Sequence, residues 1–280
     1  MSRIHVRRAR PADELAMRWI THDIWEGTDY IPMVWSSWLN DPNGIVMVAE
    51  LDGHPVGLQH VELQPDGTAW FEGIRTATPA RGTGVGRALV DAGLEWARAE
   101  GSPAARMAIY SGNEASNRLA ISAGFSVAAE FDRFSAQAGG QGGTGVRPAL
   151  PSDEQAVWEI VCRHDVSLYG EGWTAYCLSR DRLRLLLATH AVAISENMRA
   201  TGIAIATVHR PMLRIGLLAG DQAEMTEVAA WLRQCGDRTG QTTVGAILPS
   251  GNSVTAALEN AGFERRPGPV LIREVTFERA

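Results

Sequence analysis

Hydrophobic and polar positions in the first half of the chain follow two periods. Apolar residues at alternating positions predict strands over 4–9, 45–51, 56–63, 69–76 and 105–110, with another strand starting at Phe125. Apolar residues three to four positions apart predict helices over 11–20, 84–99 and 114–123, and a short helix containing Trp35 and Trp38. Asp52-Gly53 joins the second and third strands as a tight turn. The order predicts an α+β fold with a mixed, mostly antiparallel twisted sheet flanked by helices.

The segment between strand 69–76 and the following helix is dense in glycine. Gly82, Gly84 and Gly86 leave out the Cβ atoms where the backbone must approach a ligand closely. The helix start adds free N–H groups and the positive end of the helix dipole. We therefore predict a pyrophosphate cradle over residues 81–87.

The sequence starts again after a glycine-rich segment. Residues 137–145 have the composition of a flexible linker. Beyond them, Val146–Glu154 resembles Val6–Glu14, and Ser250-Gly251-Asn252 repeats Ser111-Gly112-Asn113. This internal repeat predicts two copies of one fold, in domains over 1–136 and 146–280.

The second copy has no glycine cradle. At the corresponding place, Leu217–Gln222 offers one glycine and an aspartate, Asp221, that would repel phosphate. We expect this copy to keep the scaffold without the ligand.

Composition narrows the class of function. A net charge of −6 argues against nucleic acid or an anionic membrane as the main partner. The chain has no lysine, which excludes Schiff-base chemistry and a Walker-type lysine. Its three cysteines have no ligand-like spacing, so we expect reduced thiols and no metal site. No apolar run is long enough for a membrane span and the N-terminus has no signal-peptide core, so we expect a cytoplasmic protein.

Two ordered motifs resemble those of the GNAT superfamily of acetyl-CoA-dependent N-acetyltransferases. Arg81-Gly82-Thr83-Gly84-Val85-Gly86 matches the family's cofactor signature, and Asn113 with Gly124-Phe125 matches its later motif. A Rossmann fold is the alternative, but it would need the glycine turn directly after the first strand of a βαβ unit. The resemblance implies two tandem GNAT-like domains, the second degenerate, and acetyl-CoA as co-substrate.

A narrower resemblance points to the vertebrate histidine N-acetyltransferases. It rests on five segments: Gly27–Pro32, Trp35–Pro42, Glu72–Arg75, Trp173–Ser179 and Leu183–Leu186. It implies acetylation of a small amine, most plausibly the α-amine of a free amino acid such as histidine.

The resemblance also implies how the cofactor is held. Backbone N–H groups of Gly82, Thr83, Gly84, Val85 and Gly86 would bind the pyrophosphate, with charge from Arg81 and Arg87. Pantetheine would pair with the strand Ile74, Arg75 and Thr76, where a backbone N–H faces the thioester oxygen. The family motif adds Asn113 to the cofactor residues.

Glu72 is the candidate general base, because an α-ammonium must lose a proton before it attacks. On a regular strand Glu72, Ile74 and Thr76 share one face. The alternative is that Glu72 pairs with Arg75 or another arginine for stability. We interpret His22 and His60 as ordinary surface or core residues.

Aromatic and acidic residues cluster in the segment before the first hairpin. Their interpretation is open between core packing and a pocket wall for a cationic amine. In the second interpretation Asp29 and Tyr30 anchor the ammonium, Trp35 and Trp38 line the pocket, and an arginine such as Arg75 holds a carboxylate. From the second half, Trp173 and Tyr176 are predicted to contact the acceptor.

One position departs from the family pattern. Ala120 stands where many members carry a tyrosine that protonates the leaving thiolate, so we assign no general acid. Two alternatives to an amino-acid acetyltransferase therefore stay open. One is acetylation of another amine, such as an antibiotic or a protein N-terminus, and the other is a non-enzymatic acetyl-CoA sensor.

Overall fold

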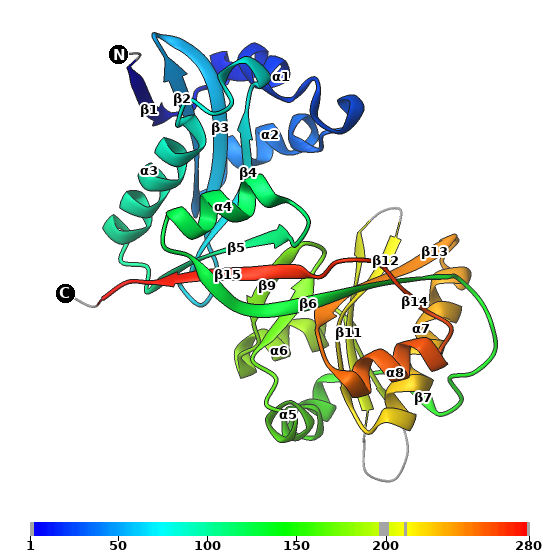
Figure 1. Ribbon diagram of the computed structural model, residues 1–280. Coiled ribbons are helices and arrows are strands. Elements are labelled where there is room, and N and C mark those ends of the chain that lie inside the picture. The colour runs from blue at the N-terminus through cyan, green and yellow to red at the C-terminus, as the bar shows by residue number, and fades with distance from the viewer. Residues whose placement is uncertain (1–2, 196–201, 210–211, 279–280) are drawn as a thin grey trace. The chain divides into compact units, whose positions relative to one another are not determined.

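The computed structural model describes residues 3–195, 202–209 and 212–278, and their contacts group the chain into two compact units. The first unit holds residues 1–109, 113–128 and 273–280, and the second holds 110–112 and 129–272. Figure 1 shows the helices and strands of both units, coloured along the chain.

The first unit is a five-strand sheet, to which two further strands each contribute a segment. Its strands lie in the order β1-β2-β3-β4-β5, antiparallel up to β4, with β5 parallel to β4. Their bounds are β1 Ile4–Arg8, β2 Gly44–Leu51, β3 His54–Leu63, β4 Ala69–Thr76 and β5 Ala104–Tyr110. The helices are α1 Glu14–Thr21, α2 Ile31–Leu39, α3 Val85–Ala99 and α4 Glu114–Ser122, with 3-10 turns at Pro11–Asp13, Ile24–Gly27 and Thr78–Ala80.

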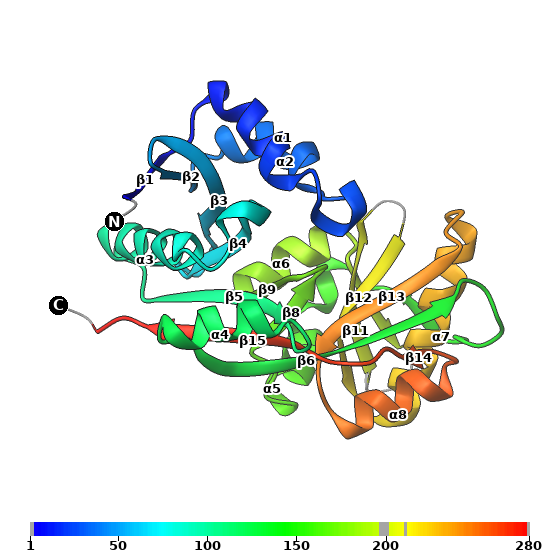
Figure 2. The same ribbon diagram turned by 45° about the horizontal axis from the view of Figure 1, so that its top comes forward.

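Helices cover both faces of this sheet. Successive residues of β3 point to opposite faces, so each of two neighbouring residues contacts a different helix. Gln59 donates to the carbonyl of Leu89 in α3, whereas His60 stacks on Trp38 in α2. Figure 2 shows α1 and α2 on one side of the strands and α3 on the other.

The second unit repeats this order. Strands β7-β10-β11-β12 are antiparallel neighbours and β13 is parallel to β12, as β5 is to β4. The strand bounds are β7 Val146–Pro148, β8 Leu168–Glu171, β9 Thr174–Cys177, β10 Val192–Ser195, β11 Gly202–His209, β12 Met212–Gly220, β13 Thr243–Pro249 and β14 Glu264–Arg265. The helices are α5 Glu154–Arg163, α6 Arg180–Ala188, α7 Gln222–Arg238 and α8 Asn252–Asn260, and a 3-10 turn spans Pro151–Asp153. The predicted fold class, two similar halves with mostly antiparallel sheets flanked by helices, is confirmed.

Two strands contribute to both units. β6 (Ser126–Gln137) gives its first three residues to the first unit, and its later residues pair with β13 in the second. β15 (Val270–Thr276) gives its last residues to the first unit, where it neighbours β5. The predicted domain boundaries, at residues 136 and 146, follow the sequence repeat and not the two compact units. They stay a prediction.

The glycine-rich segment between the repeats is bonded to α7. Gly143 N–H donates to Glu227 Oε2 (2.8 Å), and Gly139 N–H donates to the carbonyl of Arg233 (2.9 Å). A Cβ on Gly143 would lie 2.5 Å from the Trp231 side chain. Glycine composition here therefore also permits close packing.

The repeated sequence motif at the start of each half makes the same contact. Arg7 pairs with Asp13 at 2.7 Å, and Arg147 pairs with Asp153 at 2.6 Å. Each aspartate also accepts a backbone N–H three residues before it, from Arg10 or Leu150 (both 2.7 Å). The motif ties the first strand of each half to the turn before its first helix.

We expect Asp13→Asn to lower the free energy of unfolding by about 2 kcal/mol at pH 7, the scale of a charge-assisted hydrogen bond. The Arg7 guanidinium holds the pKa of the Asp13 carboxyl below its ordinary value of 3.8. Its contribution is therefore present above pH 3.8 and is lost as the pH falls further. Urea unfolding at pH 7 and pH 3 measures this. Glu114→Gln, which removes the exposed pair with Arg118, should change stability little, and equal losses in both variants would contradict the account.

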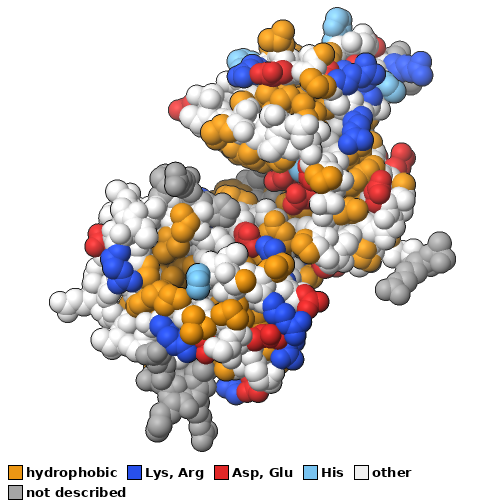
Figure 3. Space-filling view, turned by 180° about the vertical axis from the view of Figure 1, so that it is seen from behind, with side chains coloured by type: hydrophobic (Ala, Val, Ile, Leu, Met, Phe, Trp, Pro, Cys, Tyr) orange, Lys and Arg blue, Asp and Glu red, His pale blue; other side chains and the backbone are white. Residues whose placement is uncertain are grey.

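None of the described helices is long and apolar enough to cross a membrane. Acidic and basic side chains are interspersed over the face seen in Figure 3, without one large field of a single sign.

Candidate active site

A bulge in β4 sets the directions of the side chains around it. The register between β3 and β4 shifts between Leu58 and His60, and Gly73 has a φ of +64°. A Cβ on Gly73 would lie 2.6 Å from Trp38 Cη2, so the bulge needs glycine for both backbone and space. Glu72, just before the bulge, points toward the α2 side of the sheet, where it bonds His60.

The bulge breaks the alternation expected for this strand. Ile74 packs against the core cluster that contains Phe71 and Val90, on the α3 side. Thr76 Oγ1 lies 3.8 Å from the position of a Cβ on Gly86 in α3. The prediction that Glu72 shares a face with Ile74 and Thr76 is therefore wrong, because one extra residue in the strand reverses the faces after it.

Beyond the bulge, β4 has an edge free for another chain. Its parallel pairing with β5 covers only Ala69–Phe71, opposite Ala105–Met107, although β4 continues to Thr76. Over the described residues, no ladder partner takes up the β5 side of Glu72–Thr76. An extended ligand has room to pair there as an additional strand.

The glycine segment leads from this edge into α3. Gly82 and Gly84 have φ values of +79° and +95°, and α3 begins at Val85 without a side-chain cap. Within the described part of the chain, no partner is found for five backbone N–H groups, those of Gly82, Gly84, Val85, Gly86 and Arg87. Free N–H groups at the start of a 15-residue helix form an anion cradle.

The N–H of Thr83, also predicted to bind the pyrophosphate, differs from the others because it donates to the carbonyl of Ala80 (3.4 Å). Arg87 is also engaged: it pairs with Asp91 (2.8 Å) and donates to the carbonyl of Ser122 in α4. Arg81 is exposed and has no ion pair among the described residues, and its Nε lies 3.4 Å from the carbonyl of Thr76. Asn113 caps α4, accepting the N–H of Ser116 (3.1 Å). Arg81 is thus the guanidinium available to a phosphate.

Glu72 is held by a buried histidine. His60 Nδ1 lies 3.1 Å from Glu72 Oε1, its ring is 0% exposed, and its Nε2 lies 3.5 Å from Asp41 Oδ2. Trp38 stacks on the imidazole with ring centroids 4.5 Å apart. His60 therefore has a single orientation and fixes one Glu72 oxygen, whereas the sequence interpretation gave it no special role. The detectable signal was the hairpin register, which places His60 opposite Glu72.

Glu62 completes a group of ligand-type side chains. The donor atoms of His60, Glu62 and Glu72 lie within 4.8 Å of one another, and burial, aided by the charge of Glu72, raises the pKa of Glu62. Within the described ranges, this is the group that could hold a metal ion. The expectation that the protein uses no metal stays a prediction.

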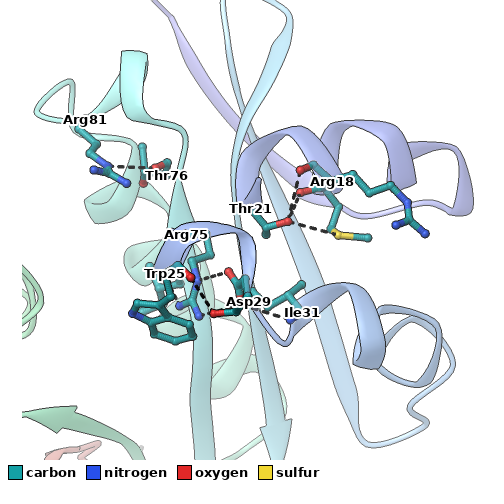
Figure 4. Close-up of polar contacts among 11 residues, drawn as sticks. Arg18, Thr21, Trp25, Asp29, Ile31, Arg75, Thr76 and Arg81 are labelled. Atoms are coloured by element: carbon teal, nitrogen blue, oxygen red, sulfur yellow. Dashed lines mark hydrogen bonds and ion pairs between the residues drawn. The ribbon is translucent and has the colours of Figure 1, made fainter. Parts of the chain in front are cut away.

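Arg75 forms an ion pair with Asp29, whereas Glu72 contacts His60. Its Nε and Nη2 bond the two Asp29 oxygens at 2.8 and 3.2 Å, and Asp29 Oδ1 also accepts the N–H of Ile31 (Figure 4). The Asp29 side chain is 1% exposed. Its oxygens are thus committed to this ion pair, so we no longer assign it to the ammonium; it positions Arg75.

Two aromatic rings lie against the Arg75 guanidinium. Its centre is 4.8 Å from the Trp25 ring and 5.7 Å from the Tyr30 ring. Trp25 and Glu26 adopt left-handed backbone angles (φ 46° and 58°), which β-carbon sterics disfavour. A bond from Thr78 to Asp23 ties this segment to the residues after β4.

The other predicted aromatic residues differ in their surroundings. Trp35 is 4% exposed and lies in the core, where it packs rather than lines an open site. Tyr30 meets Trp38 edge to face at 6.0 Å, and burial raises the pKa of Tyr30. In the second unit, Trp173 is 45% exposed between β8 and β9, while Tyr176 stacks on Tyr169. Ala120 is fully buried in the core.

In the described part of the second unit, no acidic residue stands at the position that corresponds to Glu72. In the first unit Phe71 pairs with Met107, six residues before Asn113. In the second unit Ile215 pairs with Ala246, six residues before Asn252. By this register, Gly216 corresponds to Glu72. A Cβ on Gly216 would lie 1.7 Å from the carbonyl oxygen of Gly170, so β8 occupies the space of an acidic side chain.

Comparisons with known proteins show which family domain and which folds this chain resembles. Residues 13–125 match the family model "Acetyltransferase (GNAT) family". The fold of 98% of the chain resembles the GCN5-related N-acetyltransferases from Sphaerobacter thermophilus (TM-score 0.68, 14% identity, 95% of that chain) and from Kribbella flavida (TM-score 0.56, 18% identity, 70% of that chain).

Shorter segments match named enzymes. The chain is 41% identical over 71 residues to histidine N-acetyltransferase from Xenopus tropicalis and 39% identical over 72 residues to that from Oreochromis niloticus. Each match covers 25% of this chain, and only 22% and 21% of those two proteins. Residues 13–125 of this chain therefore form a domain that is similar to the GNAT family of acetyltransferases.

Proposed function

We propose that the protein transfers the acetyl group of acetyl-CoA to the amine of a small molecule, the α-amine of a free amino acid such as histidine. The observation that carries this proposal is the β4 strand. Its free edge leads into an anion cradle, and the bulge beside that edge presents a carboxylate held in one orientation.

The cofactor would lie along the cradle and the edge of β4. The five free N–H groups and Arg81 would bind the pyrophosphate, and pantetheine would pair with Ile74–Thr76. A backbone N–H of this edge would donate to the thioester oxygen, a contact that contributes about 3 kcal/mol to acyl-transfer transition states. Asn113, as the cap of α4, would support the cofactor side of the site.

Glu72 would act as the general base. An α-ammonium has a pKa of about 8, so it carries a proton at neutral pH and cannot attack. Glu72 would take that proton, directly or through a water molecule. The amine lone pair then forms the N–C bond, the C–S bond breaks, and CoA leaves as a thiolate whose ordinary pKa of about 8.5 makes it a tolerable leaving group. The nitrogen loses its second proton to the departing thiolate or to water, which leaves a neutral amide and free CoA.

The acceptor class follows from the residues on the α2 side. Tyr30 and Trp38 would line the acceptor pocket, with the Arg75 guanidinium, held by Asp29, facing a carboxylate. The segments that match histidine N-acetyltransferases favour an amino acid over an antibiotic amine or a protein N-terminus. Trp173 and Tyr176 of the second unit stay candidates for the same acceptor.

His60 gives a test of how Glu72 is positioned. We expect His60→Leu to lower kcat about tenfold without changing KM for acetyl-CoA, because Glu72 then loses its fixed orientation. His60→Gln can still donate to Glu72 and should recover most of kcat. Steady-state kinetics of both variants measures this, and equal losses in the two would assign His60 a packing role only.

The acceptor class is tested with a matched set of amines. Histidine, its carboxamide and its decarboxylated amine are compared as acceptors, and the acetylated nitrogen is located by NMR. We expect the free amino acid to have the highest kcat/KM and acetylation at the α-nitrogen. Faster turnover of the decarboxylated amine would remove the amino-acid proposal and leave acetyl transfer to another amine.

A further inference from the structure

The second unit has an unpaired arginine on β12. Arg214 lies directly opposite Thr207 on β11 and Gly245 on β13. Its neighbours Leu213 and Ile215 point into the core cluster beneath α7. Because successive side chains of a strand alternate, the Arg214 side chain lies on the other face of the sheet.

Among the described residues, neither polar side chain of this cross-strand pair has a hydrogen-bond partner. Arg214 Nε and Thr207 Oγ1 are both buried without a hydrogen bond, and Arg214 has no ion pair within the described residues. Burial and the like charge of Arg133 lower the pKa of Arg214. A half-buried cation beside a second cation is costly unless an anion compensates it.

A second guanidinium faces the same space. Ser135 on β6 lies opposite Gly245, so Arg133, two residues earlier, projects from the same face as Arg214. The Arg133 guanidinium centre is 5.2 Å from the Tyr110 ring and 5.7 Å from the Trp173 ring. These rings hold it without neutralising its charge.

The acidic side chains of Asp132 on β6 and Glu171 on β8 are already paired. Asp132 pairs with Arg265 at 2.6 Å, and Glu171 pairs with Arg182 at 2.5 Å. Neither is a cause of the altered pKa of Arg214. Arg133 Nη1 donates to the carbonyl of Pro267 (3.3 Å), a contact that leaves its charge uncompensated. Among the described residues, no carboxylate pairs with either guanidinium, and Arg214 Nε and Thr207 Oγ1 have no hydrogen-bond partner.

We propose that Arg133, Arg214 and Thr207 form a binding site for a carboxylate or phosphate group. Two guanidinium groups and a hydroxyl are the donors that proteins use to bind such oxyanions. In the proposed function, the first half would bind an anion on backbone N–H groups at a helix start. The second half lacks that cradle, and its site is built from side chains on the sheet.

The test measures binding directly on the full-length chain by calorimetry, with inorganic phosphate and acetate as separate probes. We expect the wild type to bind at least one of them, and Arg214→Gln to weaken that binding about tenfold or more. Thr207→Val, which keeps the side-chain shape, should weaken it less. Arg163→Gln removes an exposed charge on α5 and should leave binding unchanged.

Two results would overturn the proposal. One is that the wild type binds neither probe, and the other is that Arg214→Gln and Thr207→Val both bind as the wild type does. Because no turnover is needed, the result is independent of the proposed acetyl transfer. The probe that binds more tightly identifies the ligand group as a carboxylate or a phosphate.

Discussion

Replacing Glu72 by glutamine should lower kcat by about 10²-fold or more, because the variant cannot accept the proton that the attacking amine must lose. The amide keeps the size of the carboxylate, and its oxygen can still accept from His60. The fold and the cofactor site should therefore be intact, with KM for acetyl-CoA unchanged. Steady-state kinetics over a range of pH gives both values.

The control for this variant is Glu95→Gln, which removes an exposed carboxylate from α3, away from β4. It should retain the wild-type kcat. A kcat of Glu72→Gln equal to that of the wild type at every pH would remove Glu72 from the role of base. The proton would then have to leave the amine to water or to another group.

Gly82→Asp should lower kcat/KM for acetyl-CoA by about 10²-fold, because it places a carboxylate in the cradle. Two unit charges about 5 Å apart repel by roughly 3 kcal/mol at an effective dielectric constant of about 20. Gly82 has a φ of +79° and open space around it, so an aspartate fits there at only the cost of a left-handed backbone.

Gly101→Asp is the matched control. Gly101 has a φ of +75°, also has open space around it, and lies after the far end of α3. The Gly101→Asp substitution has the same backbone cost and adds the same charge, but outside the cradle, so binding of acetyl-CoA should be unchanged. Equal losses in the two variants, measured by kinetics and by calorimetry with acetyl-CoA, would show that phosphate is not bound at this helix start.

The sequence predicted the elements whose signals are local. β4 has the predicted bounds, and α3 starts within one residue of its prediction, because glycine punctuation and apolar periodicity act over a few positions. The internal repeat predicted two similar halves, and the strand orders confirm them.

Features that depend on distant residues were not predictable in the same way. The bulge at Gly73 is one inserted residue, and it reverses every later side chain of β4. Asp29 and Arg75 are 46 positions apart, so their pairing appears only when the 3-10 turn lies over the end of β4. The exchange of β6 and β15 segments is also non-local, since neither strand's sequence specifies which neighbour it joins.

Trp38 and Trp35 show why residue type alone does not locate a site. Both are aromatic residues on one short helix, yet Trp38 stacks on the imidazole that holds Glu72, and Trp35 packs in the core. The two positions are three residues apart on one face of α2 and belong to the same buried cluster, so the stacking on His60 is what distinguishes Trp38. His60 is the converse case, a buried polar residue whose role appears from its hairpin partner.

The central claim, acetyl transfer from acetyl-CoA to a small amine, is tested most directly by amine-dependent release of CoA thiol. Purified protein with acetyl-CoA is assayed against a panel of free amino acids and other amines, and binding of acetyl-CoA is measured in parallel. The account predicts that at least one amine stimulates thiol release, free amino acids most strongly, and that Glu72→Gln binds acetyl-CoA without that release. Binding of acetyl-CoA with no release for any amine would contradict it and favour a sensor.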